Sequence, residues 1–184
     1  MSEISIFSEI VTHQIQGVML HDDLANMFDF MALSGFKCMQ EYQAKCEFSK
    51  MRETNHYAIN HMNTMLESRS TTRAKDIVPS SWRNATRFDV GENDRKSKVK
   101  ELFMKWREWE KETKAFYQKK FKELHDMGLI ASAEFVEELL EDVDHELNRI
   151  EKKILCYSSV GWDSVFILEQ QSELKHKYKE KMYK

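Results

Sequence analysis

The stretch ESRSTTRAKDIVPSSWRNATRFDVGENDRK, residues 67–96, decides how the rest of the chain folds, because it interrupts two long helical patterns. It contains the only proline of the chain, many turn-forming residues and no hydrophobic period. A connection of this length is unusual within a compact domain. Between two pairs of helices it predicts a crossover, which lets the third helix run parallel to the second.

The composition on either side of this stretch is that of a helical protein. The 184 residues include only 5 glycines, and leucine, methionine, glutamate and lysine are abundant. Apolar residues recur with the helical period over about residues 5–33, 37–66, 97–127, 131–157 and 163–183. We expect Ser5 to cap the first helix and SGF at 34–36 to form a tight break before the second. We therefore predict a single all-α domain over residues 1–184, an antiparallel four-helix bundle with a long crossover and a fifth, C-terminal helix.

Charge and hydropathy exclude several classes of function. A net charge of −3 and a pI of about 6.2 are not those of a nucleic-acid-binding protein. No apolar run is long enough to cross a bilayer, and residues 1–10 lack the basic and then apolar pattern of a signal peptide. On one helix Cys38 and Cys46 would lie about 12 Å apart, too far to form a disulfide. We expect reduced cysteines, a cytoplasmic protein, and neither nucleic-acid nor membrane partners.

The second predicted helix carries a pair of residues typical of metal sites. Glu53 and His56, in the sequence MRETNHYAINHM of residues 51–62, share one helical face. That face also contains Cys38, Tyr42 and Cys46, and the helix has a second apolar side. A helix that is apolar on two sides is buried on both. We therefore expect at least a dimer formed through this helix, or a cover provided by residues 67–96.

Polar residues also lie inside the apolar stripes of the first and third predicted helices. Gln14 and His21 are near the centre of the first stripe, and Glu110 lies within an aromatic stripe of the third helix. A carboxylate among aromatic residues is costly unless it is paired, protonated or bound to a metal. His13 and His61 fall off these stripes, and we expect them to be solvated.

The fourth predicted helix offers Asp142 and His145 at the same three-residue spacing, but in a poor register. If its apolar stripe faces the core, Val143 takes the inward position, Asp142 lies at the edge and His145 lies outside, with Glu146 closer to the core. Burial of several apolar side chains, at roughly 1.5–3 kcal/mol each, should fix this register. We therefore expect a degenerate second half-site, in which Asp142, His145 and Glu146 are the weaker candidate ligands.

A carboxylate on each of two helices with Glu-x-x-His on the other two is the di-metal pattern of ferritin-like bundles. Over about residues 5–157 the chain resembles that superfamily, which includes ferritin, bacterioferritin and rubrerythrin. Glu53 with His56 matches the Glu-x-x-His of the second helix, and Glu110 in WEKETK matches the third-helix glutamate. His21 stands where a carboxylate is usual. The segments TRFDV and WREWEKETKAFY also resemble small ferritin-like proteins, some of them prophage-encoded.

The resemblance implies a ferritin-like fold with iron, or else manganese or zinc, bound by His21, Glu53, His56 and Glu110. It further implies oxidase or storage chemistry of the ferroxidase type. An alternative for the site is a core network in which the histidines pair with the glutamates and no metal binds. The corresponding alternative for function is a non-catalytic helical assembly or adaptor protein that has kept the fold without the metal.

Overall fold

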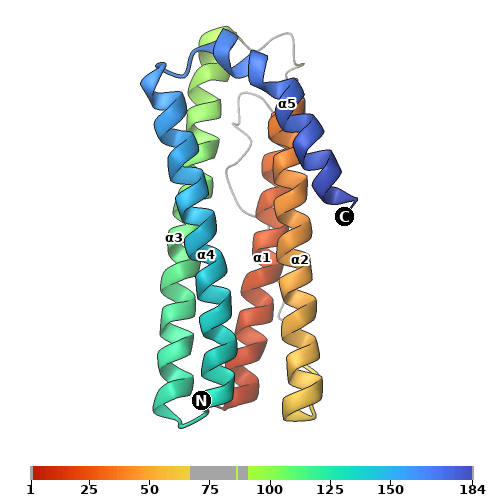
Figure 1. The fold of residues 1–184 in the computed structure, drawn as a ribbon, viewed down its shortest axis with the longest axis vertical. Coiled ribbons are helices and arrows are strands. Elements are labelled where there is room, and N and C mark those ends of the chain that lie inside the picture. Colours follow the sequence, from red (N-terminus) through yellow and green to blue (C-terminus); the bar gives the residue numbers. More distant parts are fainter. Residues whose placement is uncertain (1, 67–85, 87–90, 184) are drawn as a thin grey trace.

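The computed structural model describes residues 2–66, 86 and 91–183, which form five α-helices (Figure 1). α1 spans Glu3–Phe30, α2 Ser34–Met62, α3 Glu92–Asp126, α4 Ile130–Ser159 and α5 Ser164–Met182. The described residues contain no strand. The predicted all-α class, with four long helices and a shorter fifth, is confirmed.

The helices α2 and α3 run in the same direction along the bundle. In Figure 1 both begin at the upper end and finish at the lower end, whereas α1 and α4 run the opposite way. Short turns make α1 with α2, and α3 with α4, antiparallel pairs. The parallel orientation that the crossover predicted is therefore confirmed. Most of the crossover itself, residues 67–85 and 87–90, lies outside the described residues.

The ends of the helices differ from the prediction in three places. Ser2 rather than Ser5 caps α1, because the Ser2 hydroxyl accepts a hydrogen bond from the backbone N–H of Ser5 at 3.2 Å. The turn between α1 and α2 lies at residues 31–33, where Ala32 has a φ of 61°, so SGF begins α2 instead of breaking the chain. α3 begins several residues early, at Glu92. Its first turn is acidic, which suits the positive end of the helix dipole.

The core consists of two apolar clusters with a polar layer between them. One cluster fills the upper end with aromatic residues such as Phe36, Phe103 and Tyr157, and the other fills the lower end around Phe7 and Val136. Buried polar residues of α1, α2 and α3 lie at the intermediate depth. A layer of this kind needs internal partners, because an unpaired polar group is costly to bury.

The C-terminal helix α5 folds back across the upper end and lies along α2 (Figure 1). The side-chain oxygen of Gln171 accepts hydrogen bonds from the backbone N–H groups of Gly35 and Phe36 at 2.9 and 3.1 Å. It thereby satisfies the start of α2, which no side chain of α2 itself caps. Tyr178 of α5 packs on Tyr42 with ring centroids 5.7 Å apart.

This packing changes the interpretation of the second apolar side of α2. We expected a partner subunit or residues 67–96 over Cys38, Tyr42 and Cys46, but α5 lies against the Cys38 and Tyr42 part of that side. Cys38 is buried and Cys46 is half-buried within the single chain. α5 therefore supplies part of the cover that we assigned to a partner subunit or to residues 67–96, and a dimer through α2 stays a prediction.

No helix in the described part of the chain combines the length and the apolar character that a membrane span requires.

Candidate functional site

The side chains that α2 turns toward the bundle core are largely polar. The buried row, in steps of three and four residues, is Gln40, Gln43, Glu47, Lys50 and Thr54. Glu53 and His56 lie outside this row and are exposed. The structure therefore does not bring them together with His21 and Glu110, as the predicted metal site would require. That prediction followed the apolar stripes of α2, whereas the helix buries a polar stripe between them.

His21 of α1 and Glu110 of α3 face each other in the core, where the stripes of those two helices predicted them. They are 1% and 3% exposed, and Nε2 of His21 lies 3.8 Å from Oε1 of Glu110. Nδ1 of His21 donates to the side-chain oxygen of Gln40 at 2.7 Å, since an amide oxygen can only accept. The lone pair of Nε2 is therefore directed to Glu110. Trp106 Nε1 donates to the same Glu110 oxygen at 3.0 Å.

Both members of this pair are neutral near pH 7. Burial lowers the pKa of His21 to about 4. Burial, reinforced by the carboxylate of Glu47, raises the pKa of Glu110 to about 8. The contact is therefore not a salt bridge. Glu110 keeps its proton beside the lone pair of His21, which is how this carboxyl group tolerates its apolar surroundings.

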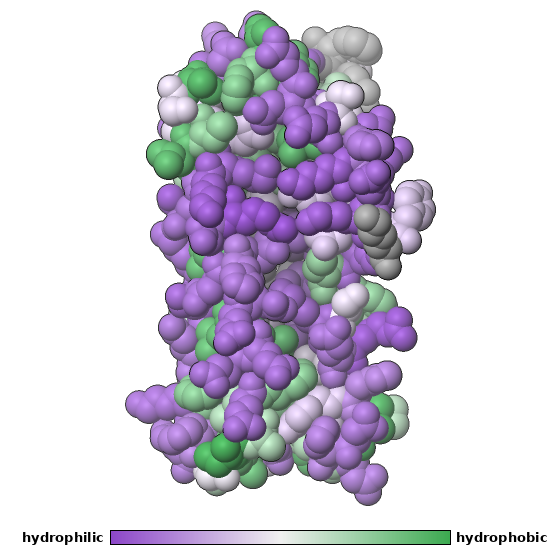
Figure 2. Space-filling view, in the orientation of Figure 1, coloured by the Kyte–Doolittle hydropathy of each residue, from purple (hydrophilic) through white to green (hydrophobic). Residues whose placement is uncertain are grey.

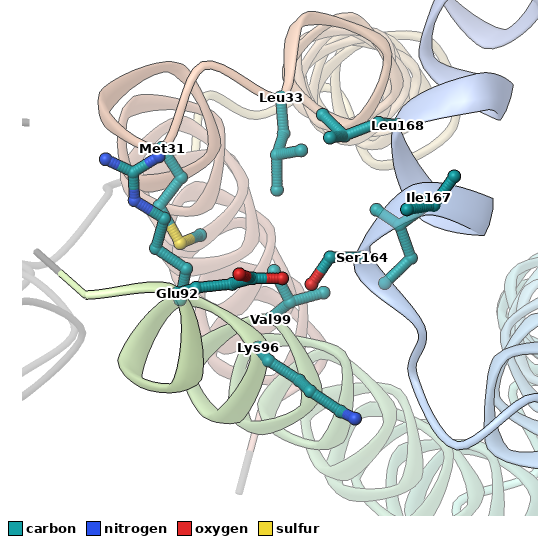
Figure 3. Close-up of a pocket in the computed structure, with 10 residues that line it drawn as sticks. Met31, Leu33, Glu92, Lys96, Val99, Ser164, Ile167 and Leu168 are labelled. Atoms are coloured by element: carbon teal, nitrogen blue, oxygen red, sulfur yellow. The ribbon is translucent and has the colours of Figure 1, made fainter.

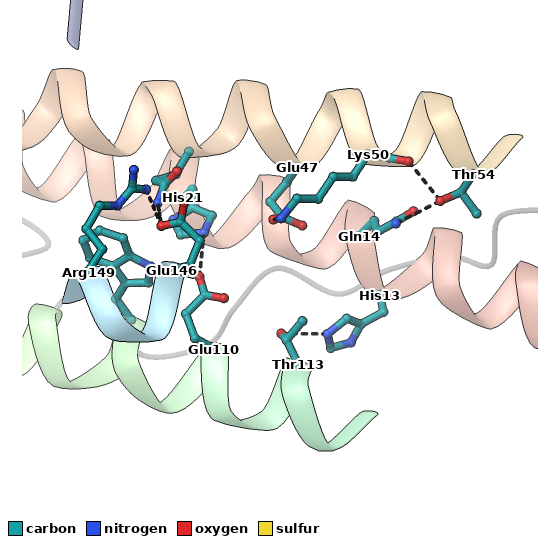
Figure 4. Close-up of polar contacts among 12 residues, drawn as sticks. His13, Gln14, His21, Glu47, Lys50, Thr54, Glu110, Thr113, Glu146 and Arg149 are labelled. Atoms are coloured by element: carbon teal, nitrogen blue, oxygen red, sulfur yellow. Dashed lines mark hydrogen bonds and ion pairs between the residues drawn. The ribbon is translucent and has the colours of Figure 1, made fainter. Parts of the chain in front are cut away.

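Lys50 is a cation held within this polar layer. It is 9% exposed, and its Nζ donates to Oε1 of Glu47 at 3.1 Å (Figure 4). Burial by itself lowers the pKa of Lys50, but the carboxylate of Glu47, the hydrogen bond to Glu47 and the carboxylate of Asp142 raise that pKa by more. Lys50 is therefore charged. Four residues further along α2, Thr54 accepts a hydrogen bond from Gln14 Nε2 at 3.0 Å.

The fourth helix lies in the register that its apolar stripe predicted. Val143 is 1% exposed, whereas Asp142 and His145 are exposed. Glu146 is half-buried, and it accepts hydrogen bonds from Gln43 Nε2 at 2.6 Å and from Arg149. Glu146 is thus tied to two nitrogen donors, and α4 provides no second Glu-x-x-His facing the core.

A polar groove of about 500 Å³ lies between α2 and α4 and opens toward Lys50. Its walls include Glu53 from α2 and Asp142, His145 and Glu146 from α4. The groove therefore brings the weaker candidate ligands near Glu53, but on the outside of the bundle. Within the described residues, no three histidine, cysteine or acidic side chains gather closely enough to hold a metal ion.

His13 lies in an environment that the sequence did not predict. It is not solvated but inserted between α1 and α3, stacked on Trp109 and Phe116 with ring centroids 4.6 and 4.4 Å away. Its Nε2 lies 2.9 Å from the hydroxyl of Thr113. Burial lowers the pKa of His13 to about 4, so the ring packs as a neutral aromatic group. His61 is exposed, as expected.

A second cavity, of about 430 Å³, lies at the upper end of the bundle and is separate from the polar layer. Its walls are largely apolar and come from the α1–α2 turn and from the beginnings of α3 and α5. Figure 3 shows Glu92 and Ser164 directed into it and Lys96 directed away. No candidate metal ligand of the sequence analysis lies there.

The di-metal centre that the resemblance implied does not fit the residues of the polar layer. Such a centre needs carboxylate and imidazole donors from all four helices. At this depth α1 presents Gly17, where an added Cβ would lie only 3.1 Å from Oε2 of Glu47. α2 presents the ammonium of Lys50, which repels a metal ion and occupies Glu47. Among the described residues of this layer, His21 and Glu110 remain as a facing donor pair.

Comparison with solved structures identifies the architecture. The chain matches an open-pore ferritin from the hyperthermophilic archaeon Archaeoglobus fulgidus with a TM-score of 0.77, over 95% of this chain and 96% of that chain. The chain has a ferritin-like fold. A closed form of the A. fulgidus ferritin made by site-directed mutagenesis matches equally well, and a humanized archaeal ferritin matches with a TM-score of 0.77 over 95% of this chain and 97% of that one.

The sequences have diverged widely despite this common fold. Identity to these three ferritins is 14–15%. No protein-family model matches the chain, and a search of curated proteins finds no relative. The likeness therefore establishes the ferritin-like fold and leaves function to the residues themselves.

The residues that sequence analysis missed are Glu47 and Lys50. A signal for them was present, because Gln40, Gln43, Glu47, Lys50 and Thr54 follow the three-and-four spacing of a single helical face. On α1, Gln14, Gly17 and His21 follow a matching spacing. Two polar rows of equal period on neighbouring helices favour a shared buried layer. Because both rows are polar, they do not stand out as apolar stripes.

Proposed function

We propose that this ferritin-like chain is a non-catalytic helical assembly or adaptor protein that works without a di-metal centre. The observation that carries the proposal is the register of α2. Glu53 and His56 are exposed, and the inward position that a second-helix ligand would occupy is filled by the Glu47–Lys50 ion pair. The candidate metal ligands are therefore apart from one another. In their place, the buried polar layer fixes how the helices pack.

The surface supports a role in assembly or binding. Figure 2 shows mostly hydrophilic residues over the middle of one face, with hydrophobic residues gathered toward the two ends. Val165 and Leu168 of α5 are 63% and 57% exposed, and Met127 and Ile130 beside the α3–α4 turn are 44% and 51% exposed. In the proposed function, these exposed apolar residues are the candidate contact sites.

Thermal unfolding in chelator and in excess ferrous iron or manganese tests this proposal. A ligand that binds only the folded state raises the melting temperature. We expect the same melting temperature in chelator and in either metal, and sedimentation velocity should show a species larger than the monomer. Melting temperatures raised by either metal would contradict the metal-free function, and a strict monomer would contradict self-assembly.

The second candidate function is binding of an iron or manganese ion, with storage or oxidase chemistry of the kind that the resemblance implied. The observation that favours it is the lone pair of His21 Nε2, which faces Oε1 of Glu110 at 3.8 Å in a fully buried site. If metal raises the melting temperature, Glu110→Ala should abolish the rise, whereas Glu53→Ala should leave it unchanged. An effect of Glu53→Ala alone would assign the ion to the groove.

A further inference from the structure

The cavity at the upper end of the bundle has the size and the lining of a small-molecule site. Its volume of about 430 Å³ falls within the roughly 300–1,000 Å³ that is usual for ligand pockets. The buried part of its wall, the floor, consists of side chains of the upper apolar cluster: Met31, Leu33, Val99 and Ile167. A molecule in the cavity would therefore rest directly on the hydrophobic core.

The rim of this cavity is apolar although it is open to solvent. Val165 and Leu168 of α5, which are 63% and 57% exposed, are part of the lining. In Figure 3, Leu33 and Leu168 lie across the open space from Val99. An apolar molecule between the floor and the rim would remove both from water, and burial of this kind is the main source of affinity in such pockets.

Polar groups beside the open space would orient a bound molecule and select its charge. Figure 3 shows the Glu92 carboxylate and the Ser164 hydroxyl directed into the cavity, close to each other, and Lys96 directed away. Both inward groups can accept a hydrogen bond. The charge of Glu92 repels an anion, and the guanidinium of Arg95, which also lines the cavity, offsets the attraction for a cation.

We propose that this cavity binds a small uncharged molecule with an apolar body and a hydroxyl or N–H group at one end. The body lies between the floor and the rim, and the polar end donates a hydrogen bond to Glu92 or Ser164. The site goes beyond the assembly function, because its occupant is a free small molecule and not another protein chain.

Binding of N-phenyl-1-naphthylamine tests the proposal. This probe is an uncharged aromatic amine with a single N–H, and its fluorescence rises in apolar surroundings. We expect saturable binding of about one probe per chain, and displacement by octan-1-ol at least about 10-fold more effective than displacement by octanoate. Glu92→Gln should make the two competitors nearly equal. Glu108→Gln, at an exposed position on the same helix outside the cavity, should leave the preference unchanged.

A pair of exposed leucines shows where the probe binds. Leu168→Ser removes an apolar side chain from the rim and leaves the floor intact, so it should weaken binding about 5–10-fold. Leu155→Ser is the matched control, because Leu155 is 71% exposed on α4 and does not line the cavity. An equal loss of affinity in both variants, or a loss in neither, would overturn the proposal, because the probe would then bind elsewhere.

The remaining outcomes separate this site from the proposed function. Saturable binding by a strictly monomeric protein supports the site and contradicts self-assembly. No saturable binding by wild type overturns the site and leaves the metal-free function intact. If, in addition, Leu168→Ser loses self-association in sedimentation velocity, the cavity receives side chains of another chain instead. Displacement by octanoate or octan-1-amine that is more effective than displacement by octan-1-ol would overturn the uncharged class of ligand.

Discussion

At the scale of single residues, Glu110 makes the stability of the protein depend on pH. Its raised pKa, about 8, means that it stays protonated in the folded state while the unfolded chain ionises near the ordinary value of 4.5. The folded state therefore binds more protons between those values, and stability falls as pH rises through them, by at most about 1.4 kcal/mol per pH unit.

Glu110→Gln should remove this fall in stability. Glutamine resembles the protonated carboxyl group, and its side-chain oxygen can still accept from Trp106. We expect the variant to match wild type near pH 5 and to be more stable by about 1–3 kcal/mol at pH 8, measured by urea unfolding. Glu108→Gln, at an exposed position on the same helix, should change neither value. A variant that is less stable than wild type at pH 8 would contradict a neutral Glu110.

The histidines should produce the opposite slope on the acid side. Burial lowers the pKa values of His13 and His21 to about 4. Below about pH 6.5 the unfolded chain therefore binds protons at these histidines that the folded chain does not bind. Stability should therefore fall as pH drops from about 6.5 toward 4. His13→Phe keeps the stacking on Trp109 and Phe116 but cannot titrate, so its urea-unfolding curve should show a shallower acid slope. A slope equal to that of wild type would mean that His13 is already charged in the fold.

How far the site could be predicted depended on what surrounds each residue. The burial of Glu110 and His21 was predicted correctly because each is a polar residue inside a clear apolar stripe of its helix. Glu47 and Lys50 were missed because their own helix has no apolar stripe at that depth. Their burial is imposed by α1, α3 and α4. The residue pattern of a single helix does not reveal such contacts with other helices.

At the scale of elements, the docking of α5 depends on one glycine. A Cβ at Gly35 would lie 2.5 Å from the backbone oxygen of Gln171, too close for any real contact. Gly35→Ala should push α5 away from α2 and break the hydrogen bonds that Gln171 accepts. We expect a loss of about 1–3 kcal/mol in stability and faster hydrogen exchange confined to α5 and the first turns of α2.

Gly91→Ala is the matched control for this change. A Cβ there would come no closer than 3.6 Å to Asp94, an ordinary contact, so exchange in α5 should be unaffected. Equal exchange rates in α5 for Gly35→Ala and wild type would show that the close approach is not required.

The elements themselves were predictable because their signals are local. Five helical periods, a shortage of glycine and proline, and one long aperiodic stretch were enough for the number, order and direction of the helices. The turn at residues 31–33 was misplaced because Ala32, not a glycine, takes the left-handed conformation. Gly35 suggested a break, yet its function is to let another helix approach, and that partner lies more than a hundred residues along the chain.

At the scale of the whole molecule, the three cysteines should report which surfaces are covered. Cys156 is exposed, Cys46 is half-buried and Cys38 is buried beneath α5. Alkylation of the native protein, followed by mass spectrometry, should modify Cys156 first and Cys38 last. Gly35→Ala should increase the rate of alkylation of Cys38 and leave the rates of Cys46 and Cys156 unchanged. Rapid modification of Cys38 in wild type would show that α5 does not cover α2 in solution.

The position of α5 also has a consequence for the order in which the protein is made. α2 leaves the ribosome early, but the helix that caps its first turn and covers Cys38 follows only after α3 and α4 have been synthesised. Chains fold from the N-terminus while synthesis continues, so the α1–α2 hairpin must wait with one apolar side uncovered. Nascent chains halted before residue 164 should therefore be the form of this protein most in need of a chaperone.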